Sequence, residues 1–129
     1  GIAGMKGMRP IKADMLISNE PGVYLPGEYG IRIESLVLAK VAGPRRDKPS
    51  ENMLKFETVT LAPIDRRLIK ADMLDDKQLA WLNDYHKRVY NTLLPKLSTG
   101  EAIWLQQATA PLKKSDPGVI PGQSGPGLS

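Results

Sequence analysis

The sequence predicts an α+β fold, in which an antiparallel sheet of three or more strands packs on two C-terminal helices. Three observations carry this prediction. Short apolar and β-branched runs separated by Pro and Gly occupy residues 15 to 61. A loop over 40–54 returns the chain, so that the strand after it lies antiparallel to the strand before it. Apolar residues at helical spacing then follow from residue 75 onward.

The first two predicted strands each carry a glutamate. One strand runs from Met15 into Glu20, and the other covers residues 31–39 and contains Glu34. The segment between them holds two Pro-Gly pairs and is predicted to be a loop, too long for a two-residue hairpin, so the turn alone does not fix the register. If the two strands pair antiparallel, the glutamates can lie within cross-strand reach, about 5 Å.

Strand 31–39 has apolar residues on both faces, which predicts a strand covered on both sides. A lone carboxylate buried there is costly unless it is paired or bound to a metal. Two interpretations stay open from the residues alone. Arg32 lies two residues before Glu34 and can form a salt bridge with it. Alternatively, Glu20 and Glu34 are oxygen ligands of a two-metal site.

Four other residues are weaker candidates for a metal or acid role. Glu57 lies within the predicted third strand, residues 56–61, and ranks below the first two glutamates. Glu28 falls at a loop tip, where a solvated position is expected. Asp14 fits a turn, because Asp tolerates left-handed backbone angles. His86 is the one histidine of the chain and lies on an apolar helical stripe, so it is predicted to pack rather than to bind metal.

Two capping boxes mark the predicted helices. Asp75 and Gln78 begin the first helix, which Pro95 ends or bends. Ser98 and Glu101 begin the second. Residues 1–112 are therefore predicted to hold the folded part, and residues 113–129, rich in Gly, Pro and Ser, to be a flexible tail.

Composition narrows the possible partners. The net charge is +4, but the basic clusters have no aromatic neighbours, which argues against nucleic-acid binding. The chain has no Cys, so disulfides and thiolate metal sites are excluded. No apolar run reaches the roughly 20 residues of a membrane span, and no signal-peptide core is present, so no membrane contact is expected. The lack of Cys fits the reducing cytoplasm, which is the expected location.

Two segments, residues 15–22 (Met-Leu-Ile-Ser-Asn-Glu-Pro-Gly) and 27–34 (Gly-Glu-Tyr-Gly-Ile-Arg-Ile-Glu), resemble the last two metal-ligand segments of Xaa-Pro aminopeptidases. These enzymes belong to the pita-bread metallopeptidases. The resemblance continues through residues 56–65 and 81–86, in the family's order. It implies that Glu20 and Glu34 are ligands of a dinuclear metal centre, with Glu34 bridging both ions.

The resemblance also implies a function and its limits. Two divalent ions, with manganese expected, would activate a water that attacks the peptide bond before proline. Glu20 would bind one ion and act on the water as a general base, and Arg32 would hold a ligand carboxylate in place. The family's other ligands, two aspartates and a histidine, lie upstream of these segments and are absent here. The chain is thus expected to be a C-terminal fragment, inactive alone, whose partners are the missing N-terminal portion, a peptide substrate with proline at its second position, and a second copy in a homodimer. The alternative is a non-catalytic pita-bread interaction or dimerisation module.

Overall fold

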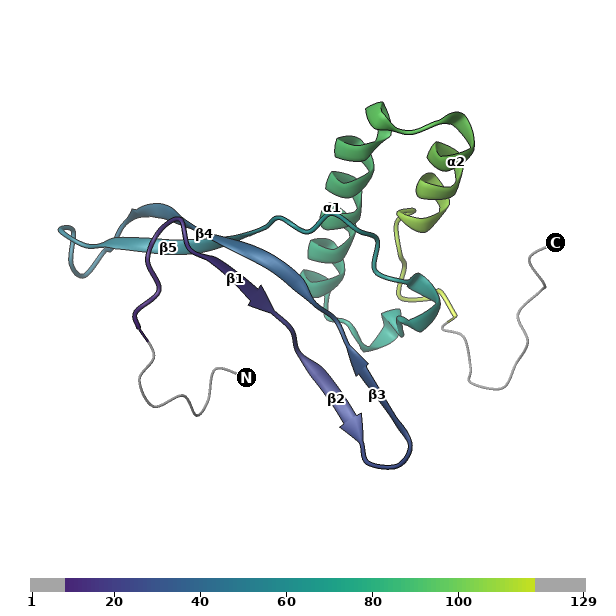
Figure 1. Cartoon of the computed structure of the whole chain (residues 1–129), viewed down its shortest axis with the longest axis horizontal. Coiled ribbons are helices and arrows are strands. Elements are labelled where there is room, and N and C mark those ends of the chain that lie inside the picture. Colours follow the sequence, from purple (N-terminus) through teal and green to yellow (C-terminus); the bar gives the residue numbers. More distant parts are fainter. Residues whose placement is uncertain (1–8, 118–129) are drawn as a thin grey trace. The chain divides into compact units, whose positions relative to one another are not determined.

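The computed structural model describes residues 9–117 and confirms the α+β class. These residues form two compact units, one ending at Thr60 and the other beginning at Leu61. In the first unit, an antiparallel three-stranded sheet has the order β1-β4-β5. A two-stranded ladder of β2 and β3 continues it (Figure 1). The strands span Leu16–Asn19 (β1), Gly22–Leu25 (β2), Tyr29–Arg32 (β3), Ser35–Pro44 (β4) and Asn52–Thr58 (β5).

The segment between the two glutamates is a β-hairpin, so the prediction of a long loop was wrong. Leu25 pairs with Tyr29, and only three residues connect them. The Glu28 N–H donates to the Leu25 carbonyl at 3.0 Å, across Pro26 and a Gly27 with φ of 76°. Proline followed by glycine at positive φ is the sequence of a type II turn. The other Pro-Gly pair does not interrupt the ladder, because Pro21 contributes its carbonyl, which accepts from Ile33 N–H at 3.1 Å.

The second hairpin is also longer than the sequence predicted. β4 extends to Pro44 and β5 begins at Asn52, so the loop predicted over 40–54 is reduced to 45–51. The register shifts between Val41 and Gly43, and Gly43 has a φ of 131°. A bulge of this kind absorbs one residue and lets the pairing continue beyond it. At the other end, β5 stops at Thr58 rather than at the predicted residue 61.

The prediction that strand 31–39 is covered on both faces was wrong. Ile31 is 51% exposed, Ile33 48% and Leu36 41%, whereas Val37 and Ala39 are buried. Ile31 lies in the two-stranded β2–β3 ladder, in which every residue of both strands is exposed. The apolar residues of that ladder share one face, since they are separated by even numbers of residues or are cross-strand partners. They are Val23, Leu25, Tyr29 and Ile31, with Ile33 continuing the same parity.

The second unit contains both predicted helices with their capping boxes. α1 spans Asp76–Leu93 behind the Asp75 cap, and α2 spans Thr99–Ala108 behind Ser98. As predicted, the first helix ends before Pro95, which lies in the short 3₁₀ turn η3, Leu94–Lys96. Two further 3₁₀ turns, η1 (Arg66–Leu68) and η2 (Ala71–Met73), precede α1.

Tyr85, Val89 and Leu105 form the core of this unit. They are packed against partly buried apolar residues: Leu61, Ile64, Tyr90, Leu93 and Leu97. Side chains of α1 also hold the extended segment before η1. The Tyr85 hydroxyl donates to the Ala62 carbonyl at 3.1 Å and accepts from the Ala62 N–H at 3.3 Å. His86 Nε2 accepts from the Ile64 N–H at 3.0 Å, so polar backbone groups of a connecting segment are satisfied by a helix.

Asn83 anchors the segment after α2 in the same manner. Its amide nitrogen donates to the Leu112 carbonyl at 3.0 Å, and its amide oxygen accepts from the Leu112 N–H at 2.8 Å. Because Leu112 is 4% exposed, Asn83→Ala leaves two backbone groups unsatisfied. We expect the free energy of unfolding to fall by about 2 kcal/mol in urea titrations. Asn91→Ala, at an exposed position of α1, is the control and should change it by less than about 0.5 kcal/mol. Equal effects of the two variants would contradict the anchoring role.

The predicted tail lies only partly within the described residues. Lys113 N–H donates to the Asp116 carboxylate at 2.8 Å, and Lys114 forms an ion pair with Asp76 on α1. Residues 118–129 lie outside the described part, so their predicted flexibility stays a prediction. Among residues 9–117, neither helix has the length and apolarity needed to cross a membrane.

Candidate metal-binding site

The two predicted ligands, Glu20 and Glu34, lie opposite each other in one continuous antiparallel register. In the β1–β4 ladder the paired residue numbers sum to 54, from Leu16 with Leu38 to Asn19 with Ser35. In the β2–β3 ladder they sum to 54 again, from Gly22 with Arg32 onward. The residue numbers of Glu20 and Glu34 have the same sum, and the two residues lie between the two ladders. Directly opposed residues have Cβ atoms about 5 Å apart, so both carboxylates can reach one ion.

The face that carries the glutamates also carries Arg32. Side chains along each strand alternate between the two faces of the ladder. The pair Glu20 with Glu34 and the pair Gly22 with Arg32, two residues further along, therefore lie on the same face. Arg32 Nε lies 3.5 Å from Glu34 Oε2, which confirms the predicted salt bridge. Ser18 Oγ donates to Glu20 Oε1 at 3.2 Å. Each carboxylate is therefore oriented by a neighbour from the same face, two residues away in the chain.

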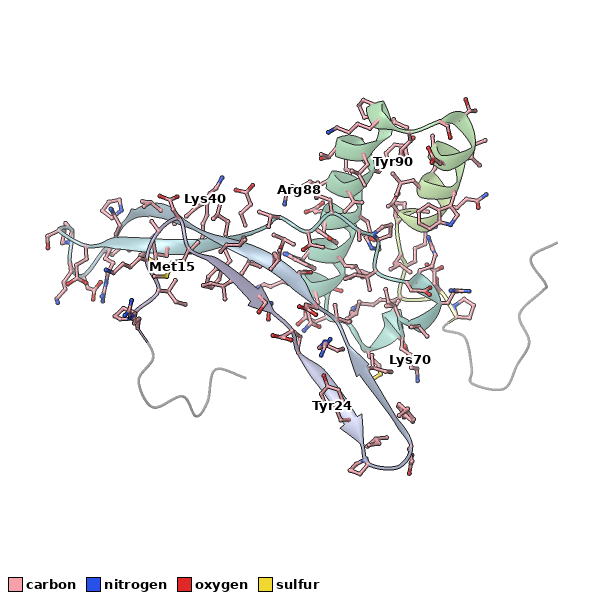
Figure 2. All side chains as sticks on the ribbon, viewed as in Figure 1. Met15, Tyr24, Lys40, Lys70, Arg88 and Tyr90 are labelled. Atoms are coloured by element: carbon pink, nitrogen blue, oxygen red, sulfur yellow. The ribbon has the colours of Figure 1, made fainter. Side chains whose placement is uncertain are left out.

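Tyr24 is the residue of this face that the sequence reasoning did not assign to the site. Figure 2 labels it on the β2–β3 hairpin. A Cβ atom added at Gly22 would lie 2.7 Å from the Tyr24 hydroxyl, and one added at Gly30 would lie 2.6 Å from the ring. The ring therefore covers both glycines. The pKa of Arg32 is raised, first by the hydrogen bond and charge of Tyr24 and then by the charges of Glu34 and Glu20.

Two glycines in the sequence indicate this arrangement. One lies two residues before Tyr24, and the other lies directly across from it on the neighbouring strand. Residues of one face recur every second position along a strand, so Gly22 shares the face of Tyr24. Gly30 is its cross-strand partner. Recognising that pairing required the register of the hairpin, which the long-loop prediction had left open. Tyr29, by contrast, lies on the other face of the hairpin with the exposed apolar residues.

The other acidic candidates do not join the glutamate pair. Glu57 forms an ion pair with Lys40 Nζ at 2.6 Å. Asp14 adopts a φ of 67°, and its N–H donates to the Ala39 carbonyl at 2.8 Å, which confirms the predicted turn. Glu28 contributes its N–H to the hairpin turn and is exposed. Within residues 9–117, no group of three or more His, Cys, Asp or Glu side chains has metal-binding geometry.

His86 packs in the interior of the second unit, as predicted, and takes no part in the glutamate pair. It is fully buried, and its Nδ1 atom has no hydrogen-bond partner among the described residues. Burial lowers the pKa of the imidazole, and the charge of Arg66 lowers it further. The neutral ring is the form that accepts the Ile64 N–H at Nε2.

This burial predicts a pH dependence of stability. The unfolded chain binds a proton at His86 near its ordinary pKa of about 6.5, whereas the folded chain binds it only at lower pH. The free energy of unfolding should therefore decrease as the pH falls from 7 toward 5, by at most about 1.4 kcal/mol per pH unit. Urea titrations of the wild type and of His86→Gln measure this slope. The variant should lose most of it over this range, and unchanged slopes would exclude His86 as the cause.

The prediction that the carboxylates of Glu20 and Glu34 are buried was wrong. Glu20 is exposed, and the side chains of Arg32 and Glu34 are 51% and 48% exposed. A strand with apolar residues on both faces is usually covered on both sides, but the end of this strand that carries Arg32 and Glu34 is not. Exposed, opposed carboxylates are ready oxygen donors for a hard divalent cation. Two of them fit part of a two-metal site, which requires further ligands.

Comparison with known proteins places the described residues in two adjacent family regions. A sequence model of metallopeptidase family M24 matches residues 3–40, which include both glutamates. A model of the C-terminal region of peptidase M24 matches residues 52–112. The two matches follow one another along the chain and have the order expected from the resemblance.

Individual relatives agree with this placement. A protein of Coprinopsis cinerea named Probable Xaa-Pro aminopeptidase P is 39% identical over 104 residues, which are 79% of this chain and 17% of the relative. A protein of the same name from Neosartorya fischeri is 40% identical over 107 residues, 81% of this chain and 16% of the relative. Among solved structures, the X-prolyl aminopeptidase of Caenorhabditis elegans, described as a cytosolic enzyme with a di-nuclear active site, has a TM-score of 0.67 and 33% identity. The match covers 79% of this chain and 17% of that one, so the chain spans about a sixth of the length of these relatives.

Proposed function

Because the chain belongs to metallopeptidase family M24, within its C-terminal portion, we propose that it supplies two carboxylate ligands, Glu20 and Glu34, to the dinuclear metal centre of an Xaa-Pro aminopeptidase. The observation that carries this proposal is the continuous register that sets the two glutamates opposite each other on one face. The remaining ligands would come from the upstream portion of a whole enzyme. Within residues 9–117 no group of three or more His, Cys, Asp or Glu side chains could hold a metal ion, so a dinuclear centre would require ligands in addition to the glutamate pair.

Four residues of the glutamate face, Glu20, Glu34, Arg32 and Tyr24, have distinct tasks in this proposal. The two ions, with manganese proposed, would lower the pKa of a bound water so that it becomes a nucleophile near neutral pH. Glu34 would hold both ions through its carboxylate. Glu20 would bind one ion and accept the proton of the attacking water. Arg32 would keep Glu34 in a fixed rotamer through the salt bridge, and Tyr24 would in turn hold the guanidinium.

The proposed substrate is a peptide with proline at the second position, from which the first residue is released. The relatives are named for this class of substrate, and the solved neighbour is described as cytosolic, which supports a cytoplasmic location. Since the amide before proline has no N–H, recognition would rely on the shape of the ring and on the free amine of the substrate. The chain alone is proposed to be inactive because the upstream ligands are needed as well.

A manganese titration of this chain tests the proposed ligand pair. Two opposed carboxylates without further ligands should bind Mn²⁺ weakly, with a Kd of roughly 10⁻⁴ to 10⁻³ M. The paramagnetic ion should broaden the amide NMR signals around residues 18–22 and 32–36 first. Glu20→Gln and Glu34→Gln should each remove this selective broadening. Glu28→Gln is the matched control at the exposed hairpin turn and should leave it unchanged.

Two outcomes of the titration would contradict the proposed pair. One is broadening centred away from both glutamates, and the other is broadening that survives both substitutions. The latter result would favour the alternative function, a non-catalytic interaction or dimerisation module. The exposed apolar face of the β2–β3 hairpin is the observation that favours that alternative. Light scattering of the chain at high concentration then separates a self-associating module from a monomer.

Arg32→Met should weaken the metal site without removing a ligand. Loss of a group that orients a ligand typically costs 10- to 100-fold in metal affinity or activity, so we expect a loss of about that size. Methionine retains much of the side-chain length but lacks the guanidinium that contacts Glu34. The comparison is best made in a full-length enzyme that carries this sequence, by manganese titration and by hydrolysis of a Xaa-Pro peptide. An unchanged manganese affinity would show that Arg32 does not orient Glu34.

A further inference from the structure

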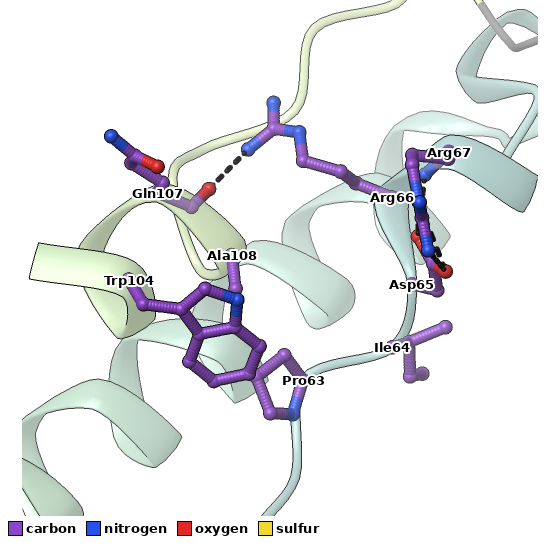
Figure 3. Close-up of a pocket in the computed structure, with 8 residues that line it drawn as sticks. All are labelled: Pro63, Ile64, Asp65, Arg66, Arg67, Trp104, Gln107 and Ala108. Carbon is purple, nitrogen blue, oxygen red and sulfur yellow. Dashed lines mark hydrogen bonds and ion pairs between the residues drawn. The ribbon is translucent and has the colours of Figure 1, made fainter. Parts of the chain in front are cut away.

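A concave site of about 410 Å³ surrounds the exposed indole of Trp104, entirely within the second unit (Figure 3). This volume lies in the range of pockets that hold small ligands or a few peptide residues. The lining comes from the segment around η1 and from the C-terminal half of α2. It comprises Pro63, Ile64, Asp65, Arg66, Arg67, Trp104, Gln107 and Ala108.

Two rings form the apolar side of this Trp104 pocket. Trp104 is 61% exposed, and Figure 3 shows its indole beside the ring of Pro63. Ala108 lies one helical turn after Trp104, and its small side chain leaves the space next to the indole open. A large exposed indole with an adjacent proline ring is a flat apolar surface of the kind that aromatic-lined peptide grooves use.

Several polar groups of the pocket already form hydrogen bonds within the protein. Arg67 is paired with Asp65, with Nη2 2.7 Å from Oδ2 and Nε 3.0 Å from Oδ1. Arg66 Nη1 donates to the Gln107 and Ala110 carbonyls at 3.1 and 3.0 Å. The Gln107 and Ala110 carbonyls and the Asp65 carboxylate therefore have donors within the protein, which reduces the capacity of the pocket to accept hydrogen bonds.

The hydrogen-bonding capacity that stays open is mainly that of donors. Within residues 9–117, the Trp104 indole N–H has no acceptor, and the side-chain amide of Gln107, with two N–H donors and one carbonyl acceptor, has no partner. Asp65 is neutralised by Arg67, and Arg66 Nη2 lies 3.9 Å from Asp116 Oδ2, so the charged groups of the lining are paired and the pocket favours an uncharged occupant. A complementary occupant is apolar, has carbonyl acceptors and brings few N–H donors.

We infer that the Trp104 pocket binds a proline-rich segment of a partner protein in the polyproline II conformation. Proline residues present apolar rings and carbonyl oxygens but no backbone N–H, which matches a pocket of rings and donors. The fixed backbone angles of such a segment also reduce the entropy lost on binding. The inference does not depend on the proposed metal site, because it rests on contacts within the second unit alone.

Binding of N-acetyl-decaproline amide to the 129-residue chain tests this inference. The acetyl group removes the free amine that an aminopeptidase site would recognise, so the result is separate from the proposed catalytic function. The chain has two tryptophans, so ¹⁵N NMR resolves two indole signals. The Trp104 signal should shift in a saturable manner, whereas the Trp81 signal should not. An N-acetyl-(Gly-Ser)₅ amide of equal length should shift neither.

Variants identify the residues responsible for binding. Trp104→Ala should raise the Kd for decaproline at least about tenfold, as expected for an aromatic anchor. Ile103→Ala, the exposed neighbour on α2, should leave the Kd within about twofold. Ala108→Leu fills the space beside the indole and should block binding as well, which keeps the test decisive if Trp104→Ala fails to fold.

The inference would be overturned by any of three results. The first is no saturable shift of the Trp104 signal with decaproline. The second is equal binding of the Gly-Ser peptide, which would indicate non-specific contact with a chain backbone. The third is an unchanged Kd in a folded Trp104→Ala or Ala108→Leu variant, which would place the peptide elsewhere on the surface.

Discussion

Replacing Glu34 by Gln should lower kcat/KM for a Xaa-Pro peptide at least about a thousandfold in a full-length enzyme that carries this sequence. Removing the carboxylate charge weakens the proposed contacts with both ions. Stabilisation of transition-state charge by such ions is worth several kcal/mol, and each 1.36 kcal/mol corresponds to a factor of ten in rate. Gln has nearly the same shape as Glu, so the hairpin register should persist and the loss can be assigned to the charge. Steady-state kinetics in the presence of excess Mn²⁺ measure the effect.

Glu57→Gln is the matched control for this experiment. Glu57 lies opposite Leu38 in the ladder, on the same face as the glutamate pair, but its carboxylate is paired with Lys40. We expect less than about a threefold change in kcat/KM, because a partly exposed ion pair contributes little. A Glu34→Gln enzyme with more than a tenth of the wild-type kcat/KM would contradict the ligand assignment. So would a comparable loss in Glu57→Gln, since it would indicate a general effect of charge on this face.

Leu105→Ala should give the largest loss of stability among single substitutions in α2. Leu105 is 1% exposed and packs in the core with Tyr85 and Val89. Truncation of a buried leucine removes its transfer free energy and leaves a cavity, which together cost about 3 kcal/mol. For a small domain this is a substantial part of the total stability. Urea unfolding followed by circular dichroism at 222 nm measures the change.

Ile103→Ala separates packing from helix propensity in the same helix. Ile103 is 54% exposed, and alanine is the better helix former, so the free energy of unfolding should change by less than about 0.5 kcal/mol. Similar losses in the two variants would mean that α2 does not pack as the structure has it. A loss near 1 kcal/mol for Leu105→Ala would mean that the core relaxes into the space left by the side chain.

Local sequence signals predicted the parts of the fold that depend on neighbouring residues. Each capping box joins residues three apart in the chain, so Asp75 with Gln78 and Ser98 with Glu101 identified both helix starts. The left-handed turn at Asp14 and the salt bridge of Arg32 with Glu34 are equally local. In these cases a few residues determine the geometry almost independently of the rest of the chain.

Features that depend on pairing or coverage were harder to predict. The hairpin register depends on how two strands align along their whole length, and the Pro-Gly pair at residues 21 and 22 suggested a break that the ladder does not have. Coverage depends on what else contacts a strand, so apolar periodicity overestimated the burial of residues 31 to 36. The role of Tyr24 required the register first, since its cross-strand partner Gly30 is defined only by it.

The shared register of the two ladders limits how this region can change in evolution. One extra residue in either arm, between Glu20 and Leu25 or between Tyr29 and Glu34, would turn all later side chains of that arm to the opposite face. The two carboxylates would then no longer share a face, although neither had been mutated. Changes of length are therefore expected to accumulate in the three-residue turn at Pro26–Glu28, while the arms change only in side-chain identity. Natural insertions and engineered tags should be tolerated at that turn and nowhere else in the hairpin.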